Sequence, residues 1–295
     1  MNHYNYFSYI FKNIKMENDK FIASSELLSI ENIKINVNLY SPENKPKGLL
    51  IITHGYGEHS GYYKEFVSFF NKKDFAVATY DLRSHGLSEG KRGHVPEFEY
   101  FLDDLQNVIN FSTGIYKDIP VYLFGHSLGG SIVLNFLLRR KPENIKKAII
   151  SSPWLKLAFE PPKSKLILAK IGKALFPSFV MKGELNIDHL SRDENFKKRF
   201  DEDPLTYDLI SPKYYFEIRD AGIWALENAD KLKIPVLISH GDDDSVTSIV
   251  ASKEFCSKVS NLCKFKEWEN GYRHVVFSEK DKTNIFDYFF AYCNY

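Results

Sequence analysis

The hydrophobic and polar positions along the chain alternate between short apolar runs and longer stretches with helical periodicity. One early run, residues 33–40, places apolar side chains at every second position, which is typical of a half-exposed antiparallel strand. Later runs are apolar at nearly every position, as expected of strands covered on both faces: 49–53, 76–80, 121–124, 148–151 and 236–239. This pattern predicts an α/β fold with a mostly parallel central sheet flanked by helices.

Stretches of helical periodicity separate these strands, and turn residues stand at the strand-to-helix junctions. The predicted helices cover residues 62–72, 98–116, 128–140, 250–259 and 282–292. The segment from about 154 to 228 interrupts the alternation, because it is mostly helical in pattern and lacks a run typical of a buried strand. We therefore expect one domain over residues 21–295, with a helical cap inserted at about 154–228 and an N-terminal extension over residues 1–20.

The composition narrows the classes of protein that fit this fold. The 295 residues carry 39 Lys and Arg against 38 Asp and Glu, a net charge of +1, so we expect no nucleic-acid partner. Hydrophobic residues make up 44% of the chain, enough for a large core. No apolar run reaches the ~18 residues of a membrane span, and the first 20 residues lack the features of a secretion signal. We therefore expect a cytoplasmic protein.

Cysteine usage points away from disulfides and metals. The three cysteines are Cys256, Cys263 and Cys293, and no C-x-x-C pair occurs. An odd number without paired spacing argues against a disulfide framework and against a zinc knuckle. The zinc motif H-E-x-x-H is absent as well. We therefore expect neither a disulfide framework nor a bound metal.

A candidate nucleophile lies in the sequence Gly125-His126-Ser127-Leu128-Gly129, which follows the strand at 121–124 and precedes a helix. Two glycines permit a tight strand-to-helix turn that holds the serine in a strained conformation above the sheet. The helix N-terminus behind the serine supplies free N–H groups and a positive dipole end for a developing oxyanion. This G-x-S-x-G setting predicts Ser127 as a catalytic nucleophile.

A serine nucleophile needs a general base and an acid that orients it, and in this type of fold they follow in the order serine, acid, histidine. Three carboxylates, Asp242, Asp243 and Asp244, come directly after the strand at 236–239. His274 is the only one of the nine histidines that follows them. The sequence therefore predicts His274 as the base and one of the three aspartates as its partner.

Three segments identify a family resemblance. Residues 54–63, HGYGEHSGYY, resemble the segment HGxGEHSGRY of the monoacylglycerol lipase and lysophospholipase-like serine hydrolases in the α/β-hydrolase superfamily. Residues 81–90, DLRSHGLSEG, are similar to the D-x-RGHGxSxG of that group, and residues 190–193 and 203–205 are similar to segments of its cap. The resemblance covers residues 32–292. It implies an α/β-hydrolase fold and acyl transfer through an acyl-enzyme, a mechanism that needs neither metal nor cofactor.

The resemblance also assigns roles by position. It chooses Asp244 as the acid, with Asp243 as the alternative. It implies an oxyanion hole made by the backbone N–H groups of Tyr56 and Leu128, two donors that are fixed before reaction.

Substrate contacts are expected at Glu58 and Tyr62, in the segment 54–63, and at Trp154, where the cap begins. Tyr62 stands where the family carries Arg, and Ser84 where it carries Gly. These departures leave the contacts to the substrate head group open.

The cap contains a basic amphipathic segment at 163–176. On a helical wheel one arc is apolar and the opposite arc is basic; the two arcs hold Ile167, Leu168, Ile171, Ala174 and Leu175, and Lys163, Lys170 and Lys173. Two interpretations remain open: a lid that transiently contacts a membrane surface, or a helix whose apolar face covers the catalytic domain.

Taken together, these features predict a serine hydrolase that cleaves carboxylic esters of single-acyl lipids, monoacylglycerol or lysophospholipid. One alternative is an esterase of small esters in the same superfamily. A second is an aminopeptidase, which needs a cap carboxylate such as Glu160 or Glu184 to hold a substrate ammonium. A third is a non-catalytic binding protein of this fold, although a binder has no physical need for the serine, acid and histidine together.

Overall fold

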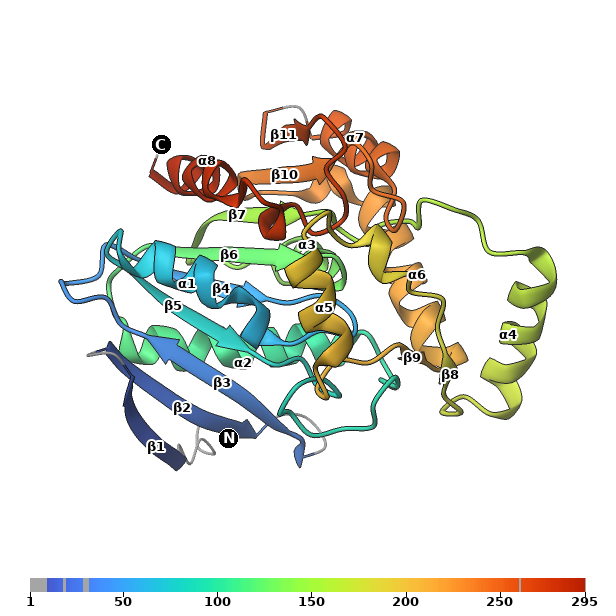
Figure 1. The fold of residues 1–295 in the computed structure, drawn as a ribbon, viewed down its shortest axis with the longest axis horizontal. Coiled ribbons are helices and arrows are strands. Elements are labelled where there is room, and N and C mark those ends of the chain that lie inside the picture. The colour runs from blue at the N-terminus through green and yellow to red at the C-terminus, as the bar shows by residue number, and fades with distance from the viewer. Residues whose placement is uncertain (1–9, 18–19, 29–31, 260, 295) are drawn as a thin grey trace.

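The computed structural model describes residues 10–17, 20–28, 32–259 and 261–294, and a central sheet runs through them (Figure 1). The strands lie in the order β1-β2-β3-β5-β4-β6-β7-β10-β11. Their bounds are β1 (Ile10–Glu17), β2 (Lys20–Leu28), β3 (Lys34–Tyr40), β4 (Gly48–Thr53), β5 (Phe75–Tyr80), β6 (Val121–His126), β7 (Ile145–Ser151), β10 (Val236–Gly241) and β11 (Cys263–Trp268). The pairs from β1 to β3 and β3–β5 are antiparallel, and the others are parallel. The predicted mostly parallel sheet is confirmed.

The burial of the strands follows their sequence patterns. In β3, every second residue is buried, as the alternation of apolar and polar residues predicts. In β4, β5, β6 and β10 every residue is buried, because helices cover both faces of the sheet. The carboxyl ends of these parallel strands meet at one edge of the sheet, where ligand sites of open α/β folds form.

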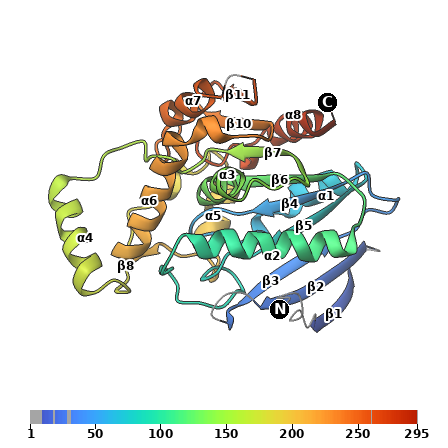
Figure 2. The ribbon, with the colours of Figure 1, turned by 180° about the vertical axis from the view of Figure 1, so that it is seen from behind.

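Helices form a layer on each face of the sheet (Figures 1 and 2). Their bounds are α1 (Lys64–Asn71), α2 (Glu99–Ile115), α3 (Leu128–Arg140), α7 (Ile249–Ser257) and α8 (Lys282–Asn294). Side chains of α1 and α8 share one buried cluster, and those of α2, α3 and α7 share the other. The helix predicted at 62–72 begins as a 3₁₀ turn, η2 (Ser60–Tyr63), that continues into α1.

The chain between β7 and β10 is mostly helical. Its elements are α4 (Lys163–Leu175), β8 (Met181–Lys182), η3 (Ile187–His189), α5 (Glu194–Glu202), β9 (Leu209–Ile210) and α6 (Pro212–Glu227). In Figure 1, α4 stands away from the sheet, whereas α5 and α6 lie close to it. Helix α6 packs on both α3 and α4. The sequence predicted that a cap covers residues of about 154–228, and these bounds remain a prediction.

The sheet begins earlier in the chain than the sequence pattern indicated. β1 lies within the segment assigned to an extension, residues 1–20, and pairs with β2. The pairing register shifts between Phe11 and Ile14. Such an irregularity breaks the two-residue period by which a strand is recognised in a sequence. The expected extension also includes residues 1–9, which lie outside the described residues.

The structure also contains a disulfide that the sequence did not indicate. Cys256 in α7 and Cys263 in β11 are bonded, with their Cα atoms 5.0 Å apart. The sequence analysis argued against a disulfide framework and did not indicate this single bond, because an odd count of cysteines does not exclude one bond between neighbouring elements. Among the described residues, Cys293 is a free and buried cysteine.

Candidate active site

Ser127 lies on a strained turn between β6 and α3. Its backbone has φ 53° and ψ −115°, a conformation that a non-glycine residue rarely adopts. The turn is too tight for side chains at its two glycines: a Cβ on Gly129 would lie 2.2 Å from the Thr53 carbonyl oxygen, and one on Gly125 would lie 2.4 Å from that of Gly129. The G-x-S-x-G sequence therefore folds as a nucleophile elbow.

Asp244 and His274 meet next to this turn. Asp244 follows β10, His274 follows β11, and the His274 Nδ1 lies 2.8 Å from the Asp244 Oδ2. Both side chains are buried. Since β10 and β11 are parallel neighbours, the loops that follow them begin at the same edge of the sheet. The structure thus brings together the predicted acid and the predicted base.

The other two carboxylates of the acidic cluster have different surroundings. Asp242 accepts hydrogen bonds from the amides of Asn270, Gly271 and Tyr272 and so braces the loop that carries His274. The Asp243 side chain is 65% exposed and lies 3.8 Å from the Arg273 Nε. Asp244 is the carboxylate in contact with His274.

Several donors surround the Asp244 carboxylate. Oδ1 accepts from the amides of Val246 and Thr247, and Oδ2 accepts from the Thr247 hydroxyl. The His240 Nε2 lies 2.9 Å from Oδ2. Burial by itself raises the pKa of Asp244, but the charge of His274 and the bonds from His240 and His274 outweigh it and hold this pKa well below its ordinary value. Asp244 therefore stays ionised beside the imidazole.

The predicted oxyanion-hole residues flank the nucleophile. Leu128 is the first residue of α3, where backbone N–H groups have no partner within the helix. Tyr56 follows Gly55, and a Cβ on Gly55 would lie 3.2 Å from the Ser127 Cβ. The loop that carries Tyr56 thus passes directly beside Ser127. The two backbone groups remain the predicted donors.

Ser127 and His274 line a cavity of about 660 Å³. Its walls come from the catalytic loops and from the chain between β7 and β10. Most of the lining side chains are apolar, including Leu157, Leu168, Ile171, Leu175, Phe176, Phe179, Met181, Phe196, Phe200 and Ile210. Two expected substrate contacts, Glu58 and Trp154, line this cavity.

Glu58 presents a buried carboxyl group to the cavity. Its Oε1 accepts hydrogen bonds from the Tyr63 hydroxyl at 2.7 Å and from the Gly55 amide at 2.5 Å. These bonds fix the side chain beside the loop of Tyr56. Burial raises the pKa of Glu58, which favours the protonated form and makes this carboxyl a potential hydrogen-bond donor.

Tyr62, the third expected substrate contact, lies outside the cavity. Its ring packs against Phe196 and Phe200 of α5, with centroid distances of 5.7 and 5.6 Å, and the guanidinium of Arg199 lies 4.6 Å from its ring centroid. Its hydroxyl donates to Asp203 at 3.3 Å. Tyr62 therefore holds α5 in place. The sequence could locate this residue beside Glu58 but could not give the direction of its side chain.

Three residues around the Asp244–His274 pair make contacts that the sequence did not indicate. His240 precedes the three aspartates in sequence, and its Nε2 lies 2.9 Å from the Asp244 Oδ2. The Thr247 hydroxyl contacts both Asp244 and the His274 Nδ1, at 2.9 and 3.3 Å. The ring centroid of His126 lies 4.8 Å from that of His274. The sequence could have indicated a role for His240 only through its position at the end of β10, and no sequence pattern distinguished Thr247.

Metal and membrane features can be assessed for the described part of the chain. It contains no group of three or more His, Cys, Asp or Glu side chains arranged to hold a metal ion. None of the helices in these residues has both the length and the apolar character required to cross a membrane.

A family model described as Hydrolase_4, serine aminopeptidase S33, matches residues 44–281. The chain belongs to this family. A solved monoacylglycerol lipase of Paleococcus ferrophilus is 28% identical to it, with a TM-score of 0.78 over 88% of this chain and 97% of the other. Phospholipase YtpA of Bacillus subtilis is 28% identical, over 82% of this chain and 93% of its own length.

A longer relative has a similar level of identity. An uncharacterized abhydrolase domain-containing protein of Dictyostelium discoideum is 29% identical over 90% of this chain, which spans 28% of that relative's length. These comparisons confirm the predicted relationship to α/β-hydrolases of the monoacylglycerol lipase type. The similarity to monoacylglycerol lipases also confirms the predicted enzyme class, a carboxylic-ester hydrolase.

Proposed function

We propose that this hydrolase cleaves the carboxylic ester of single-acyl lipids through an acyl-enzyme on Ser127. One observation carries the proposal: Ser127, on a strained elbow, and His274, which is buried 2.8 Å from Asp244, line the same largely apolar cavity. A nucleophile, a base oriented by a carboxylate and an acyl-sized pocket are the parts that ester hydrolysis by this mechanism requires.

The proposed mechanism has two acyl-transfer steps. The Ser127 Oγ attacks the ester carbonyl carbon while the His274 Nε2 accepts its proton, and Asp244 stabilises the resulting imidazolium. The amides of Tyr56 and Leu128 stabilise the oxyanion, and its collapse breaks the bond to the alcohol, which leaves with the proton from His274. Water then attacks the acyl-enzyme, gives its proton to His274, and the fatty acid leaves as Ser127 is reprotonated.

The cavity supports a substrate with one acyl chain and a neutral polar head. Apolar side chains from the catalytic domain and from α4 surround most of it, which suits a hydrocarbon chain. Glu58, whose pKa burial raises, is the fixed polar group near Ser127 and suits a glycerol hydroxyl. A carboxyl group at this place repels a phosphate when it is ionised and bonds to a hydroxyl group in either state, so we favour monoacylglycerol over lysophospholipid; the lysines that line the cavity in the described part of the chain are Lys165 and Lys182.

An aminopeptidase is the second candidate, supported by the description of the matching family. Such an activity needs an unpaired carboxylate near the substrate ammonium. Of the two cap carboxylates considered from sequence, Glu184 lines the cavity but is paired with Lys165, and Glu160 is exposed and lies outside the lining. Asp208 also lines the cavity, but burial raises its pKa and so disfavours its charged form. These features favour the ester.

A transient contact with a lipid surface is part of this proposal. Helix α4 carries exposed apolar side chains at Ile167, which is 60% exposed, and at Leu168 and Leu175, which also line the cavity. A substrate held in a membrane therefore has an apolar path from the outside of α4 to Ser127. The lysines of α4 suit an anionic surface.

A fluorophosphonate probe tests the catalytic assignment. We expect covalent labelling of the wild type at Ser127 and none of the Ser127→Ala variant; labelling that survives the substitution contradicts the assignment, and an unlabelled wild type indicates a non-catalytic binding protein.

A panel of monoacylglycerols, lysophospholipids and amino-acid amides tests the substrate. Faster hydrolysis of 4-nitrophenyl acetate than of every long-chain lipid on the panel would identify a small-ester esterase instead.

A further inference from the structure

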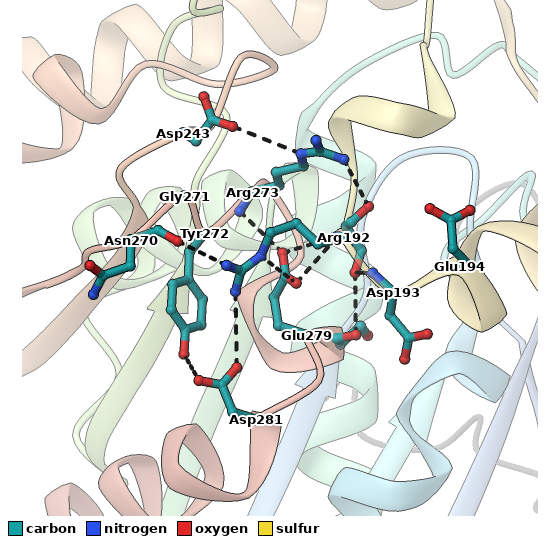
Figure 3. A network of polar contacts seen from close by, with 12 residues as sticks. Arg192, Asp193, Glu194, Asp243, Asn270, Gly271, Tyr272, Arg273, Glu279 and Asp281 are labelled. Atoms are coloured by element: carbon teal, nitrogen blue, oxygen red, sulfur yellow. Dashed lines mark hydrogen bonds and ion pairs between the residues drawn. The ribbon is translucent and has the colours of Figure 1, made fainter.

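A dense polar network joins the loop of His274 to the segment that precedes α5 (Figure 3). Its centre is Glu279, which follows η5 (Val276–Ser278) and whose side chain is fully buried at 0% exposure. Its main partner is Arg192, which lies between η3 and α5 and is 87 residues away in sequence. Neither residue belongs to the proposed catalytic set.

Every described neighbour that bonds to the Glu279 carboxylate is a donor. The Arg192 amide lies 3.2 Å from both of its oxygens, and the Arg192 Nε donates to Oε2 at 3.0 Å. The amide of Arg273, the residue before His274, donates to Oε1 at 3.2 Å. One carboxylate thus binds the segment before α5 and the backbone next to the catalytic base.

Further bonds hold the His274 loop against the same segment. The amide of Val275 donates to the Leu190 carbonyl at 2.8 Å, and the Arg273 guanidinium donates to the Asp188 carbonyl at 2.7 Å. The Arg192 guanidinium reaches the start of the loop, where it donates to the Asn270 carbonyl at 2.8 Å. The loop is therefore fixed along its length by residues 188–192.

The opposite side of the loop is fixed by the acid loop. Asp242 accepts from the amides of three consecutive residues, 270–272, and the Asp243 amide donates to the Tyr272 carbonyl at 2.9 Å. The base is thus clamped between the loop that carries its acid and the segment before α5.

Stability alone does not account for burying a charged group at this place. Replacing a buried ion pair with apolar residues of similar volume often leaves stability unchanged or raises it. The carboxylate bonds to the backbone amides of Arg192 and Arg273 and so fixes the position of one segment relative to the other, which an apolar group cannot do. We propose that Glu279 is a positioning residue for His274: with Arg192, it fixes the distance from this imidazole to Asp244 and Ser127. The inference rests on the proposed function, because it concerns the same base.

The Glu279→Gln variant tests this role. The glutamine amide would face only donors, so its NH₂ group pushes the Arg192 or Arg273 backbone away. A misplacement of ~1 Å in a catalytic site costs up to ~100-fold in rate. We expect the second-order rate of labelling by a small fluorophosphonate, and kcat for a short ester, to fall about tenfold or more, with a smaller change in KM.

The pH dependence of labelling separates positioning from general destabilisation. The charged or titratable groups that face His274 are Asp244, His126 and Glu58, with His240 behind Asp244. Loss of the Glu279 charge, or a longer distance to Asp244, removes stabilisation of the imidazolium form of His274. We therefore expect the acidic limb of the labelling rate to move to lower pH in Glu279→Gln. Glu279→Asp keeps the charge, so its limb should stay near that of the wild type.

Asp104→Asn provides the matched control. Asp104 is also a fully buried carboxylate bonded to an arginine, Arg83, but it lies on α2, which packs on the other face of the sheet. We expect this variant to unfold at a lower temperature and to keep the wild-type pH limb. If Glu279→Gln does not fold, Arg192→Lys replaces it, since lysine has one donor nitrogen in place of the two separate nitrogens with which Arg192 bonds to Glu279 and to the Asn270 carbonyl.

The outcomes are distinct. A wild-type pH limb and labelling rate in Glu279→Gln, or changes no larger than those of Asp104→Asn, would overturn the positioning role while Ser127 labelling of the wild type persists. A wild type that is not labelled at Ser127 would overturn the proposed function itself.

Discussion

The chain between β7 and β10 has two halves that differ in how they pack on the rest of the protein: the first half covers residues 152–186 and the second half residues 187–235. Helix α4, in the first half, is described in full, and none of its thirteen residues is buried. In the second half, Leu190, Phe196 and Phe200 are buried in the cluster that also contains the side chains of α1 and α8. One inserted segment therefore contains a loosely packed part and a part that belongs to the core.

The second half is also bonded to the loops that form the active site. The Tyr56 hydroxyl donates to the Leu209 carbonyl at 2.8 Å, and the Tyr207 amide donates to the Gly57 carbonyl at 3.0 Å. The contact is close, since a Cβ on Gly57 would lie 2.3 Å from the Tyr207 carbonyl oxygen. The difference leads to a prediction: the second half maintains the geometry of the proposed active site, and the first half governs access of substrate.

The largest expected effect is a difference in the free energy of unfolding between a substitution in the second half and one in the first half. Phe200→Ala removes a buried ring from α5, and we expect it to lower the free energy of unfolding by about 3 kcal/mol. Phe176→Ala, just after α4, removes a ring that is 66% exposed, and we expect a loss below about 0.5 kcal/mol. Urea denaturation measures both values. Equal losses would mean that the two halves are anchored alike.

A smaller effect tests the first half as a contact with lipid. Ile167→Asp places a charge on the exposed face of α4, and we expect hydrolysis of vesicle-bound monoacylglycerol to fall about tenfold relative to a soluble short-chain ester. Val250→Asp, a change at a residue of α7 that is 71% exposed, should leave this ratio unaltered. If both variants lower the ratio equally, the effect is one of charge alone and α4 has no special role.

The pH dependence of stability tests one contact of the second half. Asp203 lies 3.0 Å from the His59 Nε2. Burial opposes ionisation of Asp203, but the bonds from His59 and from the Leu205 amide outweigh it and lower its pKa below the ordinary value of 3.8. A depressed pKa in the folded state contributes stability above the unfolded value, and this contribution disappears as the pH falls through the folded value.

We therefore expect Asp203→Asn to be less stable than the wild type at pH 7, by about 1 kcal/mol, and the difference to shrink below about pH 4. Urea denaturation across this pH range measures it. Asp201→Asn, at an exposed residue of α5, the helix that ends just before Asp203, is the control. A difference that persists unchanged to the lowest pH would contradict the contribution of the Asp203 charge.

The smallest effect is expected at the ion pair of Lys165 and Glu184, in the first half. Both side chains are more than half exposed, at 56% and 65%. Exposed pairs of this kind contribute little, so Lys165→Gln should change the free energy of unfolding by less than about 0.5 kcal/mol. A loss above about 1 kcal/mol in thermal or urea unfolding would show that the first half is held more firmly than its exposure indicates.

The sequence predicted the parts of the fold that repeat a simple period. The buried strands were located because they are apolar at nearly every position, and α2, α3 and α8 because apolar residues recur at every third to fourth position. β1 was missed where its pairing register shifts. The disulfide between Cys256 and Cys263 was missed because only the fold brings those two residues together.

The candidate site was predictable where the order of residues along the chain indicates their chemical roles. Ser127 and His274 followed from the order of strand ends, and the choice of Asp244 needed the family resemblance. Tyr62 was predicted as a substrate contact, whereas its ring packs against α5, which lies far along the chain and which the local sequence could not indicate. The link from Arg192 to Glu279 spans 87 residues with no shared pattern, so only the folded structure reveals it.

The far edge of the sheet has a consequence for how the protein behaves in concentrated solution. β11 ends the order of described strands, so one side of its backbone has unpaired N–H and C=O groups, a template on which another molecule could add a strand. Lys264 and Lys266 stand on this strand, with their ammonium groups over the rings of Tyr288 and Trp268. Charged side chains at an edge discourage pairing between molecules. These two lysines therefore protect the enzyme against aggregation through its last strand.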